Sequence, residues 1–118
     1  MKRVLFILTA IVIVLCSFQK IKKNKVQACP APIQQLIKKY AAEEKTNPPR
    51  KIYSYTYKGQ TVYYVTAPCC DFFSDLYDSK GKLIGHPDGG FTGRGDGSIT
   101  DFEEKKSNEK IVWQDKRK

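Results

Sequence analysis

The sequence predicts an α+β domain in which one N-terminal amphipathic helix packs on a small antiparallel sheet of β-hairpins. Three observations lead to this prediction. Apolar residues recur at helical spacing over about residues 32–45, two hairpin patterns follow between residues 52 and 84, and a Gly-rich loop comes after them. Because the helix precedes the hairpins instead of alternating with single strands, the order favours α+β over a parallel α/β sheet.

The predicted helix has one continuous apolar face. The residues of this face stand at i, i+3, i+4, i+7 and i+8, and they are Ile33, Leu36, Ile37, Tyr40 and Ala41. Pro30 and Pro32 open the helix, where a proline is tolerated because its missing N–H would have had no partner. The Thr-Asn-Pro-Pro sequence at residues 46–49 ends the helix.

Residues 52–58 and 61–67 form the first predicted hairpin, with a turn around Gly59. The first of these strands alternates, so that Tyr53, Tyr55 and Tyr57 lie on one face. A row of tyrosines could stack on carbohydrate or on nucleic-acid bases, but aromatic residues are favoured in strands in general. We therefore expect these tyrosines to pack under the helix and to hydrogen-bond at its edge.

The second half of the chain predicts a hairpin, a loop and a last strand. Residues 76–78 and 82–84 flank the turn sequence Ser-Lys-Gly. Five glycines fall in residues 86–97, a density that predicts a loop without regular structure. The apolar patch Ile111-Val112-Trp113 lies among charged residues and predicts an edge strand guarded against aggregation, with a short helix as the alternative.

The N-terminal residues predict export. Residues 4–18 contain no charge and follow Lys2 and Arg3, which is the order of a signal peptide or a membrane anchor. Fifteen helical residues rise roughly 23 Å, against a hydrocarbon core of about 30 Å, so the length favours a cleaved signal. Cys16 is either a lipoprotein cysteine or one more apolar residue. Residues 1–18 are thus a signal peptide or anchor, residues 19–28 a basic linker, and residues 29–118 a single small domain.

An uncleaved anchor is the open alternative. In that case four lysines within residues 19–28 outnumber the two basic residues before the apolar segment, and the domain would stay on the cytoplasmic side. We expect an extracytoplasmic place in the cell envelope, with the membrane contacted through the N-terminal segment.

The positive charge of the chain does not predict a nucleic-acid binder. The net charge is +9, but residues 1–28 hold six Lys or Arg and no acidic residue. Setting these six charges aside leaves +3 for residues 29–118. The basic footprint expected of a nucleic-acid-binding domain is therefore missing, and the charge excess belongs to the region next to the predicted membrane segment.

The cysteines of the domain predict a disulfide. In an oxidising compartment, Cys29 is expected to pair with either Cys69 or Cys70. Such a bridge closes a loop of about 40 residues, worth on the order of 3–4 kcal/mol, which would matter for a small core. One thiol would remain. A metal site at the adjacent cysteines is not predicted, because the chain has one His and no second Cys-x-x-Cys pair.

The loop from residue 86 to 101, beside residues 69–71, is the predicted binding surface. Its candidate residues are His86, Asp88, Arg94, Asp96, Asp101 and the neighbouring Asp71. The glycine spacing fits neither a dinucleotide fingerprint nor a P-loop. Asp88, Asp96 and Asp101 could offer oxygen ligands to Ca²⁺. Since aspartates in Gly-rich turns usually stabilise the turn, no metal and no cofactor are predicted.

Three functions are compatible with these residues. The leading hypothesis is a non-enzymatic module that binds an unknown protein or ligand in the cell envelope. The alternative is a small thiol- or calcium-dependent enzyme that uses Cys70 and His86, with Asp71, Asp75 or Asp88 orienting the base. No local signature of an activated cysteine, a serine elbow or a kinase supports it. The third possibility is a purely structural envelope protein.

The run APCCDFFSDLYDSKGKLIGHPDGGFTGRGDG resembles an uncharacterised bacterial family of domains of unknown function, found in exported proteins and lipoproteins. The similarity extends from the QQLIKKY segment to the apolar patch at 111–113. The resemblance implies a compact domain outside the cytoplasm and no particular reaction. The family pattern has cysteines before the HPDGG run and before the DF pair, where this chain has Gly85 and Ile99. The resemblance implies that a disulfide closing the loop between these two positions in relatives is absent here.

Overall fold

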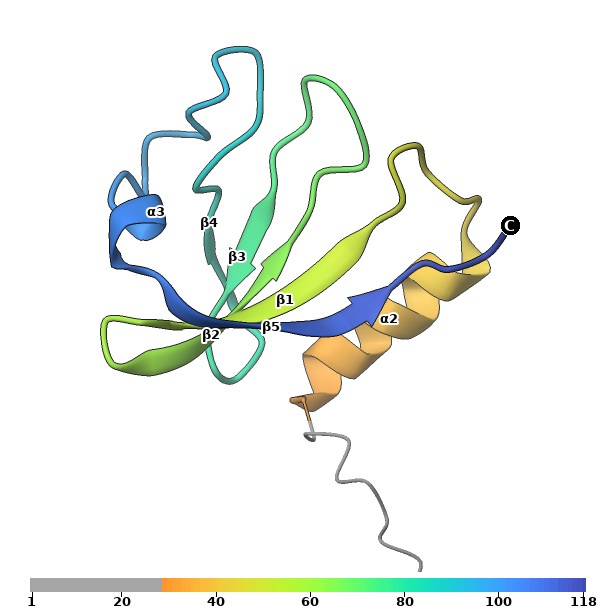
Figure 1. Cartoon of the computed structure of the whole chain (residues 1–118), viewed down its shortest axis with the longest axis horizontal. Coiled ribbons are helices and arrows are strands. Elements are labelled where there is room, and N and C mark those ends of the chain that lie inside the picture. Colours follow the sequence, from red (N-terminus) through yellow and green to blue (C-terminus); the bar gives the residue numbers. More distant parts are fainter. Residues whose placement is uncertain (1–28) are drawn as a thin grey trace, which may run out of the picture.

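Residues 29–118 are described by the computed structural model, and they form a helix and an antiparallel sheet. The elements are α2 (Ala31–Ala42), β1 (Lys51–Tyr57), β2 (Gln60–Val65), β3 (Asp75–Tyr77), β4 (Leu83–Gly85), α3 (Phe102–Lys105) and β5 (Ser107–Gln114). The five strands lie in the order β4-β3-β2-β1-β5 and every neighbouring pair is antiparallel. Figure 1 shows α2 along one side of this sheet. The α+β class is confirmed.

The two predicted hairpins are both formed. β1 and β2 are joined at Lys58 and Gly59, and β3 and β4 are joined by residues 78–82. In the second turn one carboxylate oxygen of Asp78 accepts the backbone N–H groups of Lys80 and Lys82, each at 2.9 Å. An Asp in this position favours the turn because its side chain satisfies backbone groups locally. The residues that predicted this turn are therefore the ones whose hydrogen bonds stabilise it.

The C-terminal segment contains both a short helix and an edge strand, the two structures considered for it from the sequence. The four-residue helix α3 comes first, and β5 then pairs with β1 at the edge of the sheet. The outer residues of β5 are polar and exposed, from Ser107 to Lys110. Charged and polar residues on an edge strand discourage pairing with another chain. The predicted edge strand is confirmed.

The sheet buries apolar side chains on both faces. One face meets α2, and this cluster contains Cys29, Ile33, Tyr40, Ile52, Tyr63 and Val65. The other face meets α3, and this cluster contains Tyr55, Tyr57, Val62, Leu76 and Phe102. Successive strand residues point to opposite faces, so β1 contributes Ile52 to the first cluster and Tyr55 and Tyr57 to the second.

The predicted place of the tyrosines is wrong. Tyr55 and Tyr57 do not pack under α2; they pack on the opposite face, with ring centroids 5.5 and 5.4 Å from that of Phe102. Ile52 and Ser54, one residue out of phase, point to the side of α2. The prediction failed because Phe102, which covers the second face, lies 45 residues further along the chain and carries no local signal.

Arg117 fixes the C-terminal end of α2. The helix ends at Ala42, earlier than the predicted limit near residue 45. The Arg117 guanidinium donates to the backbone oxygens of Tyr40, Ala41 and Glu43 at 3.1, 3.1 and 2.8 Å. The last carbonyls of a helix have no partner within it, and a cation is favoured there. The C-terminal residues thus pack against the end of α2, and Figure 1 shows the C-terminus beside that end of the helix.

The acid sensitivity of the fold should depend on the partner of Arg117. Asp115 is buried and receives hydrogen bonds from the Arg117 Nε and Nη2 at 2.9 and 2.6 Å. These bonds lower the pKa of Asp115 to about 2, from an ordinary value of 3.8. Because the folded-state pKa is depressed, the pair stabilises the fold fully above about pH 4 and loses this contribution as pH falls toward about 2.

We therefore expect Asp115→Asn to flatten the pH dependence of stability in this window, measured by chemical denaturation at a series of pH values. Asp71→Asn, which changes an exposed carboxylate, is the matched control and should leave the slope unchanged. Hydrogen bonds from Lys105 and Tyr57 also lower the pKa of Asp101. Its contribution to the pH dependence of stability is therefore present in both variants. An unchanged slope in Asp115→Asn would contradict the prediction.

Candidate functional site

Two loops lie together at one end of the sheet and form the candidate site. Residues 66–74 join β2 to β3, and residues 86–97 follow β4 (Figure 1). The Ser74 N–H donates to the Asp88 carbonyl at 3.2 Å, and the Gly90 N–H donates to the Phe72 carbonyl at 3.1 Å. The Gly-rich segment is therefore an ordered loop that is hydrogen-bonded to its neighbour.

Glycine is required in this loop where backbones come into contact. Gly95 has a φ of +67°, and a Cβ atom there would lie 1.9 Å from the His86 carbonyl oxygen. Gly89 has a φ of +82°, and its Cβ would lie 2.4 Å from the Phe72 carbonyl oxygen. Only glycine combines a positive φ with such close backbone approach. The glycine density that predicted a loop thus reflects a tightly packed one.

A chain of hydrogen bonds anchors the two loops to β2. The Ala67 N–H donates to the Ser74 hydroxyl at 3.2 Å, and the Ser74 and Tyr64 hydroxyls are 3.1 Å apart. The Tyr64 hydroxyl lies 2.7 Å from the Asp88 carboxylate. Burial raises the pKa of Tyr64, so its hydroxyl keeps its proton and donates to Asp88. Asp88, a predicted binding residue, therefore has a positioning role inside the site.

A cleft of about 340 Å³ opens between the two loops and the start of β1. Its lining residues are Arg50, Thr66, Pro68, Phe72, Phe73, Asp75 and His86. The His86 Nδ1 lies 2.9 Å from the Asp75 carboxylate, and its ring stacks on that of Phe73 with centroids 5.1 Å apart. Asp75 was one of three carboxylates considered as a partner for this histidine, and it is the one that pairs with it.

Arg50 brings a positive charge to the cleft. Its guanidinium carbon lies 4.2 Å from the centre of the Tyr40 ring, a cation–π contact. Its Nε is buried and, among residues 29–118, has no hydrogen-bond acceptor. A buried donor without an acceptor is unusual, because its desolvation is uncompensated. Arg50 also lines the cleft, so its guanidinium places a positive charge in the cleft wall.

Aromatic side chains are exposed around the cleft. Phe72 is 63% exposed, Phe73 42% and Phe91 93%. Phe72 and Phe73 belong to the first loop and Phe91 to the second. Of the three, Phe72 and Phe73 line the cleft, and exposed apolar surface at a cleft commonly marks a place of interaction.

The predicted disulfide from Cys29 is wrong. Cys69 and Cys70 are bonded to each other, and Cys29 is a free, buried cysteine. Cys29 lies at the N-terminal end of α2, whereas the 66–74 loop lies at the end of the sheet near the helix C-terminus (Figure 1). A twelve-residue helix is about 18 Å long, so the two sites are too far apart for a bridge.

This pairing also bears on the alternative of a thiol enzyme. Catalysis by a cysteine needs a free thiolate, and the Cys70 sulfur is bonded to Cys69 instead. His86 is paired with Asp75, and no hydrogen bond joins it to Cys70 within the described part of the chain. The proposed catalytic pair is therefore not assembled.

The three aspartates considered for calcium have separate partners. Asp88 binds Tyr64, Asp96 accepts hydrogen bonds from Ser98, and Asp101 lies at the other end of β1 beside Tyr57. The bonds from Ser98 hold the pKa of Asp96 below its ordinary value. Among residues 29–118, no three His, Cys, Asp or Glu side chains are grouped to hold a metal ion. The calcium hypothesis is not supported.

The structure places the residues of the predicted binding surface in different surroundings. His86 lines the cleft and Asp88 supports it, while Asp71 and Arg94 are exposed on the two loops. Sequence reasoning missed Arg50, whose only local signal is its place after two prolines. It also missed the two phenylalanines that follow the cysteine pair, although adjacent aromatic residues in a loop are an available signal.

A profile of the family described as a domain of unknown function (DUF6970) matches residues 38–115. The chain belongs to this family. The matched region of the DUF6970 domain includes all five strands and both loops of the site. No curated protein and no solved structure matches the chain. In the part of the DUF6970 chain from residue 29 onward, no helix is long and apolar enough to cross a membrane.

Proposed function

We propose that this DUF6970 protein is exported to the cell envelope and binds a protein or ligand, without enzymatic activity, at the cleft between its two loops. The observation that carries the proposal is the exposure of Phe72 and Phe73 in a cleft that also contains Arg50 and His86, with the exposed Phe91 on the second of the two loops.

The rigidity of the two loops supports a binding role. Their backbones are hydrogen-bonded to each other, and Tyr64 ties both to the sheet. A surface that is ordered before it binds loses less conformational entropy when a partner arrives. Such a surface also keeps its apolar side chains exposed instead of folding them inward. Exposed aromatic groups on a rigid frame are the arrangement expected of an interaction site.

Two observations support export. The N-terminal residues 1–18 have the charge and apolar order of a signal peptide or anchor, and they lie outside the described residues. The disulfide between Cys69 and Cys70 also favours an oxidising compartment, because disulfides rarely persist in the cytosol.

The binding role is tested by a photoreactive amino acid placed in the full-length protein in its own cells. At position 72 or 91 it should give a discrete covalent adduct, detected as a mass increase or a larger band. At position 80, an exposed residue of the β3–β4 turn at the opposite end of the sheet, it should give none. The same adducts from all three positions, or none from 72 and 91, would refute the proposal.

The export role is tested separately by fractionation and intact mass of the same protein. We expect it outside the cytoplasm, with Cys69 and Cys70 blocked to alkylation and Cys29 present as a thiol. A cytosolic protein in which every cysteine is reduced would overturn the envelope assignment. It would leave the binding result untouched.

A further inference from the structure

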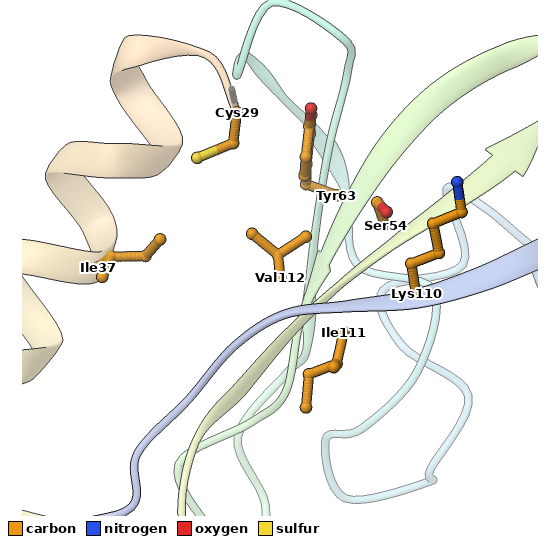
Figure 2. Close-up of a pocket in the computed structure, with 7 residues that line it drawn as sticks. All are labelled: Cys29, Ile37, Ser54, Tyr63, Lys110, Ile111 and Val112. Carbon is orange, nitrogen blue, oxygen red and sulfur yellow. The ribbon is translucent and has the colours of Figure 1, made fainter. Parts of the chain in front are cut away.

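A second pocket lies on the other side of the molecule from α3, between α2 and the edge of the sheet. It has a volume of about 230 Å³, and Figure 2 shows the residues that line it. They are Cys29, Ile37, Ser54, Tyr63, Lys110, Ile111 and Val112. None of these residues lines the cleft described above. The walls are mainly apolar, with Ile37 from the helix facing Val112 from β5.

Ser54 and Tyr63 bring two hydroxyl groups to this pocket, and neither is sealed from solvent, since in residues 29–118 the fully buried side-chain polar atom without a partner is Arg50 Nε. Ser54 is 5% exposed and Tyr63 is 6% exposed, and within residues 29–118 neither hydroxyl makes a hydrogen bond. Burial raises the pKa of Tyr63, so its hydroxyl is a protonated donor. Hydroxyl groups that have no protein partner and open into an apolar pocket can hydrogen-bond a ligand there and fix its orientation.

The rim of the pocket carries a positive charge. Lys110 is an exposed residue of the edge strand β5, and Figure 2 shows its ammonium group on the same side as the two hydroxyls. The Lys110 ammonium group forms no ion pair with a side chain of the described region. A ligand that fits this arrangement has an apolar chain for the interior and an anionic head for the rim.

We propose that this pocket binds the apolar end of an anionic amphiphile of the fatty-acid type. The chain lies between Ile37 and Val112, and the head group meets Lys110 and the hydroxyls of Ser54 and Tyr63. An apolar cavity of about 150 Å³ holds a benzene molecule, so the volume here suits about eight chain carbons. Cys29 contributes a small apolar wall.

The place of the pocket suits either of two sources of this chemistry. Cys29 directly follows the basic linker, residues 19–28, which connects the domain to the predicted membrane segment. A free fatty acid and the acyl chain of an anionic membrane lipid would both offer an apolar chain with a negative head. The experiment includes both.

The first arm uses octanoate with a diazirine at its chain end, added to the full-length protein and activated by light. Labelling should map by peptide mass to Ile37 and Val112, whose side chains face each other in Figure 2. Lys110→Gln should reduce labelling at a low probe concentration about two- to fivefold, the range expected for one exposed ion pair. Lys82→Gln, an exposed lysine of the other hairpin, should change nothing.

A pocket-filling variant tests the location. Val112→Phe should lower labelling about tenfold or more, since losing room for two chain carbons is worth about that factor. Thermal unfolding checks that the variant is folded, and Ile37→Phe fills the same space from the helix if it is not. Labelling that survives both variants, or that maps elsewhere, would overturn the proposal.

The remaining arms separate the head group and the source. A photoreactive octanol, which is neutral, tests the head group. If it labels the pocket as well as octanoate does, and if Lys110→Gln changes the labelling by neither probe, the anionic head is refuted. Vesicles of phosphatidylglycerol with the same diazirine on one acyl chain test a membrane source. Labelling of the pocket from the vesicles or from free octanoate supports the proposal, and labelling from neither refutes it. Because this pocket and the cleft share no residue, either proposal can fail alone.

Discussion

Replacing Phe102 by alanine is expected to lower the free energy of unfolding by about 3–5 kcal/mol, the usual cost of truncating a buried phenylalanine. Phe102 is 2% exposed. Its ring meets Tyr55 and Tyr57 edge-on and stacks on Tyr64, with centroids 5.5, 5.4 and 5.8 Å apart. Truncation would leave a cavity against the sheet and would also remove these aromatic pairs.

Chemical denaturation of Phe102→Ala and of the unmodified protein measures this loss. Small domains have total stabilities of about 5–15 kcal/mol, so the variant should be close to unfolding at moderate temperature. Phe91→Ala is the matched control, because Phe91 is 93% exposed and its removal should change stability by no more than about 0.5 kcal/mol. A loss below about 1 kcal/mol in Phe102→Ala would show that α3 does not close the second core.

The double variant Gly85→Cys/Ile99→Cys is expected to form a disulfide that raises its free energy of unfolding by about 3 kcal/mol above that of the same variant in the reduced form, the value for a 15-residue loop. A Cβ atom added at Gly85 would lie 2.8 Å from the Ile99 Cδ1, so the two positions are already in contact. The bridge would close the loop that carries the candidate binding surface.

The same double variant with the new bridge reduced is the control. The Ser98 hydroxyl lies 2.5 Å from the added Cβ and has to rotate away, so the reduced form should be less stable than the unmodified protein. Denaturation with and without the bridge, with oxidation confirmed by mass, separates the two effects. If oxidation does not raise stability above the reduced form, the two positions are not placed as the structure has them.

Much of the fold could be predicted because its signals are local. The stripe from Ile33 to Ala41 gives the helix, and the glycines of the turns give both hairpins. The end of α2 could not be predicted in this way, because Arg117, which caps it, lies more than 70 residues away in the chain. The pairing of β5 with β1 also joins residues far apart in the chain, although the charges around residues 111–113 indicated that this strand lies at an edge.

The candidate site was only partly predictable for the same reason. His86 and the Gly-rich loop were found because glycine and a lone histidine stand out in a sequence. The roles of Arg50, Asp75 and Tyr64 depend on which strands lie side by side, and no spacing along the chain encodes that. The prediction of a disulfide from Cys29 failed because the separation of two cysteines in sequence does not give their distance in space. Cys29 and the 66–74 loop lie toward opposite ends of α2.

The sequence by itself determined the α+β class, the position of the helix, the hairpin turns and the loop, since each depends on residues within one or two turns of each other. Membership of the DUF6970 family is likewise a property of the sequence. Only the tertiary structure decided that the sheet is covered on both faces, that Cys69 pairs with its neighbour, and that two separate pockets exist. These features depend on contacts between residues far apart in the chain, and such contacts follow from packing the whole domain.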